Sequence, residues 1–269
     1  MGQGDAILFR LPTGENFLID TGKDSAIFRS LDKVLPWYVK KIDYVLITHG
    51  DLDHIGALPD ILRRYKVDII FVSYLFGEKQ IEQDIQKQIQ HTNTKIIELS
   101  IGDYLTFGTS IKNNFKIIHP NSDCFEKHKS HNECSLVVLA QYGEHTFLLT
   151  GDIGKKVEPE VSKFIDNTID VLKVAHHGSK YSTGEDFVSK TKPQYSVISV
   201  GQNSYGHPTK EVLDILSKFD SVIFSTKETA TIVAVSSGEN IKVKSLFDQT
   251  RFFQSSICAI FLYGFDASC

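Results

Sequence analysis

Short apolar runs recur along the chain, and turn residues or segments with helical spacing separate them. The first two runs, 6–12 and 15–20, flank Thr13-Gly14 and predict a β-hairpin. The run 43–49 is almost continuously apolar, which is typical of a strand covered on both faces. Segment 57–65 places apolar residues at helical spacing and predicts a helix. The start of the chain therefore combines a hairpin with a strand–helix unit.

The same two kinds of unit continue along the chain. A Gln-rich helix with a narrow apolar stripe is predicted over 78–92. Further strands are predicted at 68–73, 95–99, 115–120, 135–142 and 145–151. Beyond them, helices and strands alternate over 155–166, 170–175, 184–191, 195–200, 208–218 and 221–226. Hairpins mixed with strand–helix units predict an α/β domain of two β-sheets with helices outside.

Length, composition and charge describe an ordinary globular chain. Its 269 residues suffice for one large domain, and 41% of them are apolar and 23% charged. The formal net charge of −4 disfavours a broad basic face for nucleic acid, although a local basic groove is compatible with it. The N-terminal residues do not have the pattern of a signal peptide, and no apolar run reaches the roughly 20 residues of a membrane span.

The cysteines add an expectation about location. Cys124, Cys134, Cys258 and Cys269 are scattered and form no CxxC pair. This spacing predicts neither a disulfide framework nor a cysteine zinc site. A reducing cytoplasm is therefore the expected location.

One loop concentrates residues that bind metal ions. Directly after the run 43–48, the chain reads His-x-Asp-x-Asp-His, with His49, Asp51, Asp53 and His54. Carboxylates gathered at the end of a buried strand repel one another, and a bound cation would compensate that repulsion. Imidazole nitrogens and carboxylate oxygens without thiolates suit zinc, manganese or iron. The loop therefore predicts part of a metal site.

Two later segments end in the same way. Asp152 follows a strand and a glycine, and the pair His176 and His177 follows the strand 170–175. Because a sheet gathers its strand ends along one edge, the three segments are expected to converge. A single Asp or His after a strand is usually a helix cap or a loop hydrogen bond. Three such segments in order favour a dinuclear metal centre.

Together, these motifs resemble the metallo-β-lactamase superfamily, and more narrowly the metallo-hydrolase domain of ComEC-type competence proteins and their stand-alone relatives. The matching stretches lie in family order between residue 2 and about residue 245, and they read GQGDAILF, FLIDTG, LITHGDLDHIGAL, NECSLVV, FLLTGD, DVLKVAHHGSKYST and SYGHP. The resemblance implies an αββα sandwich of two mixed β-sheets with helices on the outer faces. It also implies two divalent ions, zinc or manganese, and a metal-bound hydroxide that attacks an ester or a phosphodiester.

The resemblance also implies a ligand set. His49 and Asp51 are expected to hold one ion, Asp53 and His54 the other, and Asp152 is expected to bridge them. The superfamily usually has a histidine at the position of Asp51, but the competence-type branch often has aspartate there. Asp53 is also expected to orient the attacking hydroxide.

Two ligand positions have more than one candidate. His176 is expected to complete the second ion's site, with His177 as the alternative, since only one of the two need face the metal. Asn132 matches the position where the superfamily has its third-motif histidine, and the neighbouring His131 could replace it. A solvent-exposed loop is the simpler interpretation of His131.

The resemblance places other residues on the substrate side. His207 in SYGHP matches a position at the pocket rim, where an imidazole could donate to a phosphate oxygen or protonate the leaving group. A histidine that only precedes a helix is the alternative. Ser179, Lys180 and Ser182 belong to a small polar loop that could hold a phosphate, although a plain turn explains them equally well.

The two ends of the sequence depart from the family pattern. Relatives usually carry a strand before GQGD, and its absence is expected to leave a sheet edge exposed. We expect a hydrolase domain over 1–246 and an apolar tail of unknown role over 247–269, which is a possible protein-partner element or a sequence accident. The chain is expected to be a stand-alone hydrolase domain or a fragment.

The function predicted from these features is metal-dependent hydrolysis, with a phosphodiesterase or nuclease first. The expected substrate is a phosphodiester, either single-stranded DNA or a small nucleotide. The alternative is a small ester, a lactone or a cyclic nucleotide, which the net negative charge weakly favours over long DNA. A second alternative is a non-catalytic interaction module in which the metal is structural.

Overall fold

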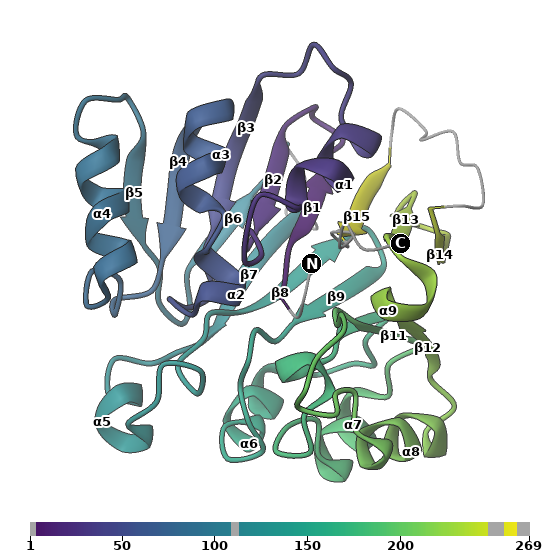
Figure 1. Ribbon diagram of the computed structural model, residues 1–269. Helices are drawn as coiled ribbons and strands as arrows, with labels where there is room; N and C mark the ends of the chain where they lie inside the picture. Colours follow the sequence, from purple (N-terminus) through teal and green to yellow (C-terminus); the bar gives the residue numbers. More distant parts are fainter. Residues whose placement is uncertain (1–3, 109–112, 247–255, 263–269) are drawn as a thin grey trace.

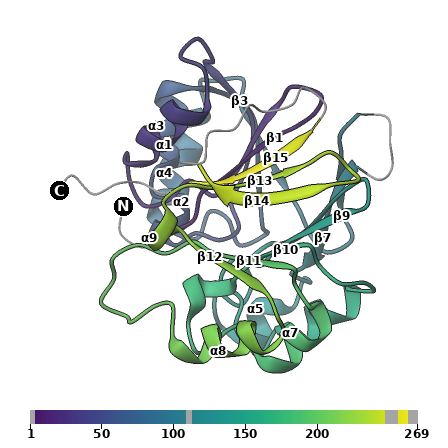
Figure 2. The ribbon, with the colours of Figure 1, turned by 90° about the vertical axis from the view of Figure 1, so that its right-hand side faces the viewer.

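Two mixed β-sheets stacked face to face form the centre of the molecule, and helices cover both outer faces (Figure 1). The computed structural model describes residues 4–108, 113–246 and 256–262. Figure 2 shows α1, α3 and α4 on one side of the two sheets and α5, α7 and α8 on the other. The predicted αββα sandwich is therefore confirmed.

In the described residues, the first sheet has eight strands. Four neighbouring strands, β2 to β5, run parallel, and the strands from β14 to β2 are antiparallel. In spatial order they are β14 (Ile241–Ser245), β13 (Ile232–Ser236), β15 (Ile257–Phe261), β1 (Ile7–Arg10), β2 (Asn16–Ile19), β3 (Lys41–Leu46), β4 (Lys66–Val72) and β5 (Lys95–Glu98).

The second sheet has seven strands in the same part of the chain. The strands from β12 to β9 run parallel and the remainder are antiparallel. In spatial order they are β12 (Val222–Ser225), β11 (Tyr195–Ile198), β10 (Val171–Lys173), β9 (His145–Leu149), β8 (Val137–Tyr142), β7 (Asn113–His119) and β6 (Tyr104–Thr106).

Apolar stripes hold the helices against the sheets. In α1 the buried residues Ile27, Leu31 and Val34 recur at helical spacing and pack on the first sheet. In α8 Val212 and Leu216 do the same on the second sheet. The helices are α1 (Ile27–Val34), α2 (Leu52–Ile55), α3 (Leu58–Arg64), α4 (Gln80–Ile89), α5 (Cys124–His128), α6 (Glu158–Val161), α7 (Glu185–Thr191), α8 (Lys210–Lys218) and α9 (Thr226–Thr229), with 3-10 turns η1 (Ser162–Phe164) and η2 (Ala175–Gly178). Within the described ranges, none of them is long and apolar enough to cross a bilayer.

Aromatic side chains fill the layer between the two sheets. The ring of Phe115 from the second sheet lies 5.0 Å from that of Phe9 and 5.2 Å from that of Phe17, both from the first sheet. All three side chains are buried, as is Phe147 from β9. Rings of this size bury much apolar area, so this layer ties the sheets together and sets where their edges meet.

Part of the predicted tail lies inside the first sheet. The strand β15 pairs antiparallel with β1 on one side and with β13 on the other, and all five of its residues are buried. The edge of β1 that the sequence suggested would be exposed is therefore covered. Residues 256–262 belong to the domain, and the other tail residues, 247–255 and 263–269, lie outside the described residues.

The structure contains a disulfide bond between Cys124 and Cys134. The prediction that the cysteines form no disulfide is wrong for this pair, because folding brings their Cα atoms to 5.9 Å although they are 10 residues apart. The bond closes the loop that carries His131 and Asn132.

Candidate metal centre

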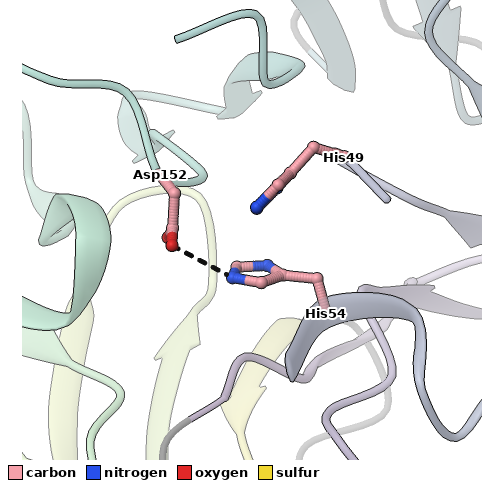
Figure 3. A group of neighbouring side chains, drawn as sticks. All are labelled: His49, His54 and Asp152. Carbon is pink, nitrogen blue, oxygen red and sulfur yellow. Dashed lines mark ion pairs between the residues drawn. The ribbon is translucent and has the colours of Figure 1, made fainter. Parts of the chain in front are cut away.

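Buried histidines and an aspartate meet where strands of both sheets end. His49 follows β3, His54 lies in α2, Asp152 follows β9 and His177 follows β10. Figure 3 shows His49, His54 and Asp152 with their polar ends directed toward one another. The Oδ2 atom of Asp152 lies 3.3 Å from Nε2 of His54 and 3.5 Å from Nε2 of His177. The predicted convergence of these segments is what the structure contains.

A close approach of two backbones positions Asp152. Gly151 has a φ of 52°, and a Cβ at this residue would lie 2.7 Å from Cβ of Ser135. Only glycine fits this turn without displacing its neighbour. The Ser135 hydroxyl in turn accepts a hydrogen bond from the backbone N–H of Asp152 at 3.2 Å. The glycine before Asp152 therefore sets the direction of the carboxylate.

The two neighbouring histidines after β10 have different surroundings. Both adopt left-handed backbone conformations, with φ of 48° at His176 and 54° at His177. The side chain of His177 is fully buried, and its Nε2 lies 3.3 Å from Oδ2 of Asp53. The side chain of His176 is one-third exposed (33%), and its Nε2 lies 4.0 Å from Asp152. The geometry favours His177 as the ligand. The sequence pattern had favoured His176, with His177 as the alternative.

Asp20 fixes the orientation of His54, a role that the sequence pattern did not predict. The Nδ1 atom of His54 lies 2.7 Å from Oδ2 of Asp20, which leaves Nε2 facing the centre. Asp20 in turn accepts hydrogen bonds from the N–H and the hydroxyl of Thr48, at 2.8 and 2.7 Å. Its φ of 56° is a strained conformation that these contacts maintain. The sequence feature that could have indicated this role is an acidic residue at the end of the apolar run 15–20.

A buried lysine lies beneath the centre. Lys173 is fully buried, contacts the carboxylate of Asp5, donates to the carbonyl of Gly151 at 3.1 Å and lies 3.7 Å from Oδ1 of Asp152. The sequence contained a signal, since a lysine inside the apolar run VLKVA needs a buried partner. Asp5 also lies 3.6 Å from Nδ1 of His177, whose ring bonds to the carbonyl of Ser199. Asp5 and Lys173 thus surround the ligand candidates.

Opposing charges shift the pKa values in this cluster. Burial lowers the pKa of His54, but the carboxylates of Asp152 and Asp20 outweigh it and place that pKa well above its usual value. Burial and the neighbouring His54 hold the pKa of His49 well below its usual value. Burial raises the pKa of Asp152, but His54 and His177 hold it well below its usual value. The carboxylate of Asp152 is therefore favoured in its ionised form, and a cation that binds would displace the proton of His54.

The residues of this centre fit a divalent metal ion. Within the described part of the chain, Nε2 of His49, His54 and His177 and Oδ1 of Asp152 are buried without a hydrogen-bond partner. Buried polar atoms without partners are rare and require an explanation. Ligand atoms of His49, His54 and Asp152 lie within 4.8 Å of one another, as do those of Asp53, His54 and His177. Imidazole and carboxylate donors at this spacing are a metal-binding set.

Other predicted ligands lie beside this set. Asp51 forms an ion pair with Lys79, and its Oδ2 lies 3.7 Å from Nε2 of His49. His131 has its Nε2 3.4 Å from Glu78, which lies directly before Lys79, the residue that precedes α4. The backbone carbonyl of Asn132 accepts a hydrogen bond from Ser135. Asp51, Asn132 and His131 are outside the two groups, so their role as ligands stays a prediction. No pattern in the sequence predicted that Lys79 would contact Asp51.

The predicted substrate residues divide into buried and exposed ones. The hydroxyl of Ser182 donates to the carbonyl of Ala175, and that of Ser179 accepts from a backbone N–H within the loop. Both side chains are buried and their hydroxyls hold the turn, and their role in substrate binding stays a prediction. Lys180 is exposed beside them. The ring of His207 lies 6.0 Å from that of His176, and its role toward the substrate stays a prediction.

The fold and this centre together define a class of protein, the metallo-β-lactamase-type hydrolases. The family model of the metallo-beta-lactamase superfamily matches residues 1–202, and the chain therefore belongs to this superfamily. Superfamily members are typically metal-dependent hydrolases that bind divalent ions.

Comparison with known proteins gives more specific relatives. The chain is 32% identical over 252 residues to ComE operon protein 3 of Bacillus subtilis, covering 86% of this chain and 32% of that protein. It is 29% identical over 240 residues to recombination protein 2 of Haemophilus influenzae, covering 84% of this chain and 27% of that protein. The chain thus spans about a third of the length of these relatives. The predicted resemblance to the competence-type branch is confirmed.

Solved structures share the fold. The metallo-β-lactamase fold protein YhfI of Bacillus subtilis has a TM-score of 0.50 and 15% identity, covering 78% of this chain and 84% of that chain. The Zn²⁺-bound PqqB of Methylobacterium extorquens has a TM-score of 0.51 and 8% identity, covering 78% and 81%. At these identities the similarity establishes the fold alone.

Proposed function

We propose that this chain is a metal-dependent phosphodiesterase, which would act as a nuclease if its substrate is a polymer. The observation that carries the proposal is the set of three buried Nε2 atoms, of His49, His54 and His177, that face Asp152 without hydrogen-bond partners among the described residues. Such a set is suited to hold metal ions that activate water and neutralise phosphoryl charge. Hydrolase chemistry in general follows from the superfamily.

We propose two divalent ions, zinc or manganese. His49 and Asp152 would hold one, with Asp51 beside them. Asp53, His54 and His177 would hold the other, with Asp152 between the two sites. When bound, the ions would lower the pKa of a coordinated water and neutralise charge on the phosphoryl oxygens.

Residues of this chain supply the remaining functions. Asp53 is partly exposed and lies 3.3 Å from His177, so its carboxylate can orient the attacking water while it holds the ion. Burial and the neighbouring His176 lower the pKa of His207, so this imidazole is neutral at neutral pH. A neutral imidazole donates a hydrogen bond, and His207 would direct it to a phosphoryl oxygen. Lys180 adds an exposed positive charge beside the phosphate. These donors favour a phosphodiester over a neutral ester.

The net charge of −4 favours a small phosphodiester over a long nucleic acid, because long polymers gain affinity from many phosphate contacts. A cyclic nucleotide or a short oligonucleotide is therefore the first substrate class to test. A small ester or lactone remains the alternative for the same centre.

The proposal is tested by hydrolysis of bis(p-nitrophenyl) phosphate and p-nitrophenyl acetate by protein loaded with zinc or manganese. We expect metal-dependent hydrolysis of the phosphodiester and little of the acetate. Asp152→Ala should lose metal and hydrolysis together, and the exposed control Asp166→Ala should keep both. An Asp152→Ala variant with full metal content and rate, or a wild-type protein that cleaves only the acetate, would disprove the proposal.

A further inference from the structure

A row of rings leads from the metal centre to the surface. Nε2 of His176 lies 4.0 Å from Asp152, and the ring of His207 lies 6.0 Å from that of His176 at an interplanar angle of 79°. The ring of Tyr205 follows at 5.8 Å from His207, with the two planes inclined by only 28°. Tyr205 ends the row and is 74% exposed. A ring stacked on one side and open on the other offers a flat surface to a ligand.

The loop that carries this row is held in place by its own hydrogen bonds. The side-chain oxygen of Asn203 accepts from the backbone N–H groups of Tyr205 and His207, at 3.1 and 3.0 Å. Its amide nitrogen donates to the carbonyl of His207 at 2.9 Å. The backbone N–H of Thr209 donates to the carbonyl of Gly178, the residue that directly follows the two histidines. The loop is therefore docked on the turn that carries His176, and Tyr205 has a defined position relative to the centre.

Other exposed apolar side chains lie close to site residues in the sequence. Eight large apolar residues are exposed in the described part of the chain, and three of them, Leu52, Tyr181 and Tyr205, lie within two residues of a site residue. Leu52 lies between two of the metal-loop aspartates, and Tyr181 follows Lys180. The ammonium group of Lys180 lies 5.1 Å from the centre of the Tyr181 ring. An exposed aromatic ring and a positive charge thus occur together on the loop that follows the two histidines.

We infer that Tyr205, stacked on His207, is a platform that binds the base of a nucleotide substrate. The inference rests on the proposed phosphodiesterase function and adds the residue that would hold the base. Bases stack on exposed aromatic side chains regardless of base identity, because every base has a π-face. With the phosphodiester at the metal centre and Lys180 near its charge, the base of the same nucleotide would cover the open face of Tyr205.

The first test compares two substrates with the same leaving group and charge. These are thymidine 5′-(p-nitrophenyl phosphate), which carries a base, and methyl p-nitrophenyl phosphate, which has none. We expect kcat/KM of the metal-loaded protein to be at least about tenfold higher for the thymidine ester. Tyr205→Ala should remove that preference, mainly by raising KM for the thymidine ester. Tyr205→Phe should retain it, because the ring is kept.

The matched control is Tyr38→Ala. Tyr38 is similarly exposed, but it precedes β3, at the opposite end of that strand from His49. This variant should keep the preference for thymidine. Equal kcat/KM of the wild type for both esters would overturn the inference. So would an equal loss on both esters in Tyr205→Ala.

A binding measurement separates this inference from the proposed function. Fluorescein-labelled tetrathymidylate and an abasic tetramer of the same charge, both with hydrolysis-resistant phosphorothioate linkages, are titrated by fluorescence anisotropy with the metal-loaded protein. We expect about tenfold tighter binding of tetrathymidylate by the wild type, and equal binding of the two by Tyr205→Ala. If neither ester is hydrolysed but this difference is found, the phosphodiesterase proposal fails and the platform stands. Equal wild-type affinities for the two tetramers would disprove the platform whatever the hydrolysis result.

Discussion

At the residue scale, backbone conformation decides which histidine enters the centre. Left-handed φ values at two consecutive non-glycine residues, His176 and His177, are energetically costly and occur mostly where function requires them. They turn His177 into the protein interior and leave His176 at the rim beside His207. We therefore propose His177 as the ligand and His176 as a residue of the substrate side.

The two histidines can be distinguished by metal analysis. His177→Ala should lose at least about half of the bound metal, because it removes one of three ligands from its group. His176→Ala should keep its metal content and serves as the matched control. The measurement is metal per chain by mass spectrometry after loading with zinc. The reverse pattern would show that His176 is the ligand, as first expected from the sequence.

Another buried carboxyl group lies outside the metal cluster. Glu158 accepts hydrogen bonds from the backbone N–H groups of Thr183 and Gly184, on the loop that follows the histidines. Burial raises its pKa from 4.5 to about 7, despite these two bonds. The folded chain thus binds this proton more tightly than the unfolded chain does.

This raised pKa predicts a pH dependence of stability. Because the folded state holds the Glu158 proton more tightly, its contribution is complete below about pH 4.5 and is lost as the pH rises to about 7. The free energy of unfolding should fall by up to roughly 3 kcal/mol across this range from this group. Denaturant unfolding of wild type and Glu158→Gln at pH 5, 6 and 7 gives the difference, with chelator present. A wild-type slope equal to that of Glu158→Gln would contradict the assignment.

At the element scale, β15 joins two parts of the first sheet. It pairs with β1 on one side and with β13 on the other, so the β13–β14 hairpin is attached to the rest of this sheet through β15. Its buried residues include Ile257, Ile260 and Phe261. Burial of three such side chains stabilises the fold by roughly 5 kcal/mol, which is comparable with the total stability of many domains.

Truncation tests this role of β15. A chain that ends at Leu246 should aggregate or lose cooperative unfolding, because β1 and β13 would both become open edges. A chain that ends at Leu262 keeps β15 and should unfold like the full chain. Thermal unfolding and size-exclusion chromatography measure the outcome. A stable, monomeric chain ending at Leu246 would show that β15 is dispensable, as expected from an independent tail.

The disulfide constrains a second element, the loop before β8. Cys124 and Cys134 close a loop of 10 residues, and a loop of this size is stabilised by about 2–3 kcal/mol through the lost entropy of the unfolded chain. Reduction with dithiothreitol should lower the free energy of unfolding by that amount. In Cys124→Ser the reductant should have no effect, and it serves as the control. Equal stability of the oxidised and reduced wild type would contradict this estimate.

At the scale of the whole molecule, the centre lies between the two sheets. The first sheet supplies His49 and His54 through the loop after β3, and the second supplies Asp152 and His177 after β9 and β10. A bound ion would therefore connect the sheets at one edge, in addition to the aromatic layer between them. If the ion binds only the folded chain, its binding free energy adds to the free energy of folding.

Metal removal should accordingly destabilise the entire domain. At a free metal concentration of 100 times Kd, binding adds about 2.7 kcal/mol to the free energy of unfolding. For a chain of this size, Tm should rise by roughly 2–4 °C for each kcal/mol. Calorimetry with zinc and after chelation measures the shift, and Asp152→Ala should show little of it. A wild-type Tm that does not respond to either treatment would argue against a metal that links the sheets.

Much of the fold and the location of the centre could be predicted from local sequence. Short apolar runs indicated strands such as β3, β9 and β10, because such a run depends on residues only a few positions apart. The motif His49 to His54 and the residue Asp152 were found in this way, since strand ends gather at a sheet edge. Other elements were missed, including α1 and the hairpin of β13 and β14.

Contacts between distant segments depended on the tertiary structure. Three contacts join segments that are separated in the sequence. They are the pairing of β15 with β1 and β13, the disulfide bond between Cys124 and Cys134, and the contact of Asp20 with His54. The choice of His177 over His176 depends on two left-handed residues whose cost is compensated by surrounding contacts. Local patterns determine which segments are strands, helices or polar loops. Which of them pair, and which side chains turn inward, is decided by packing and burial across the whole chain, because those free energies involve partners that no short window of sequence contains.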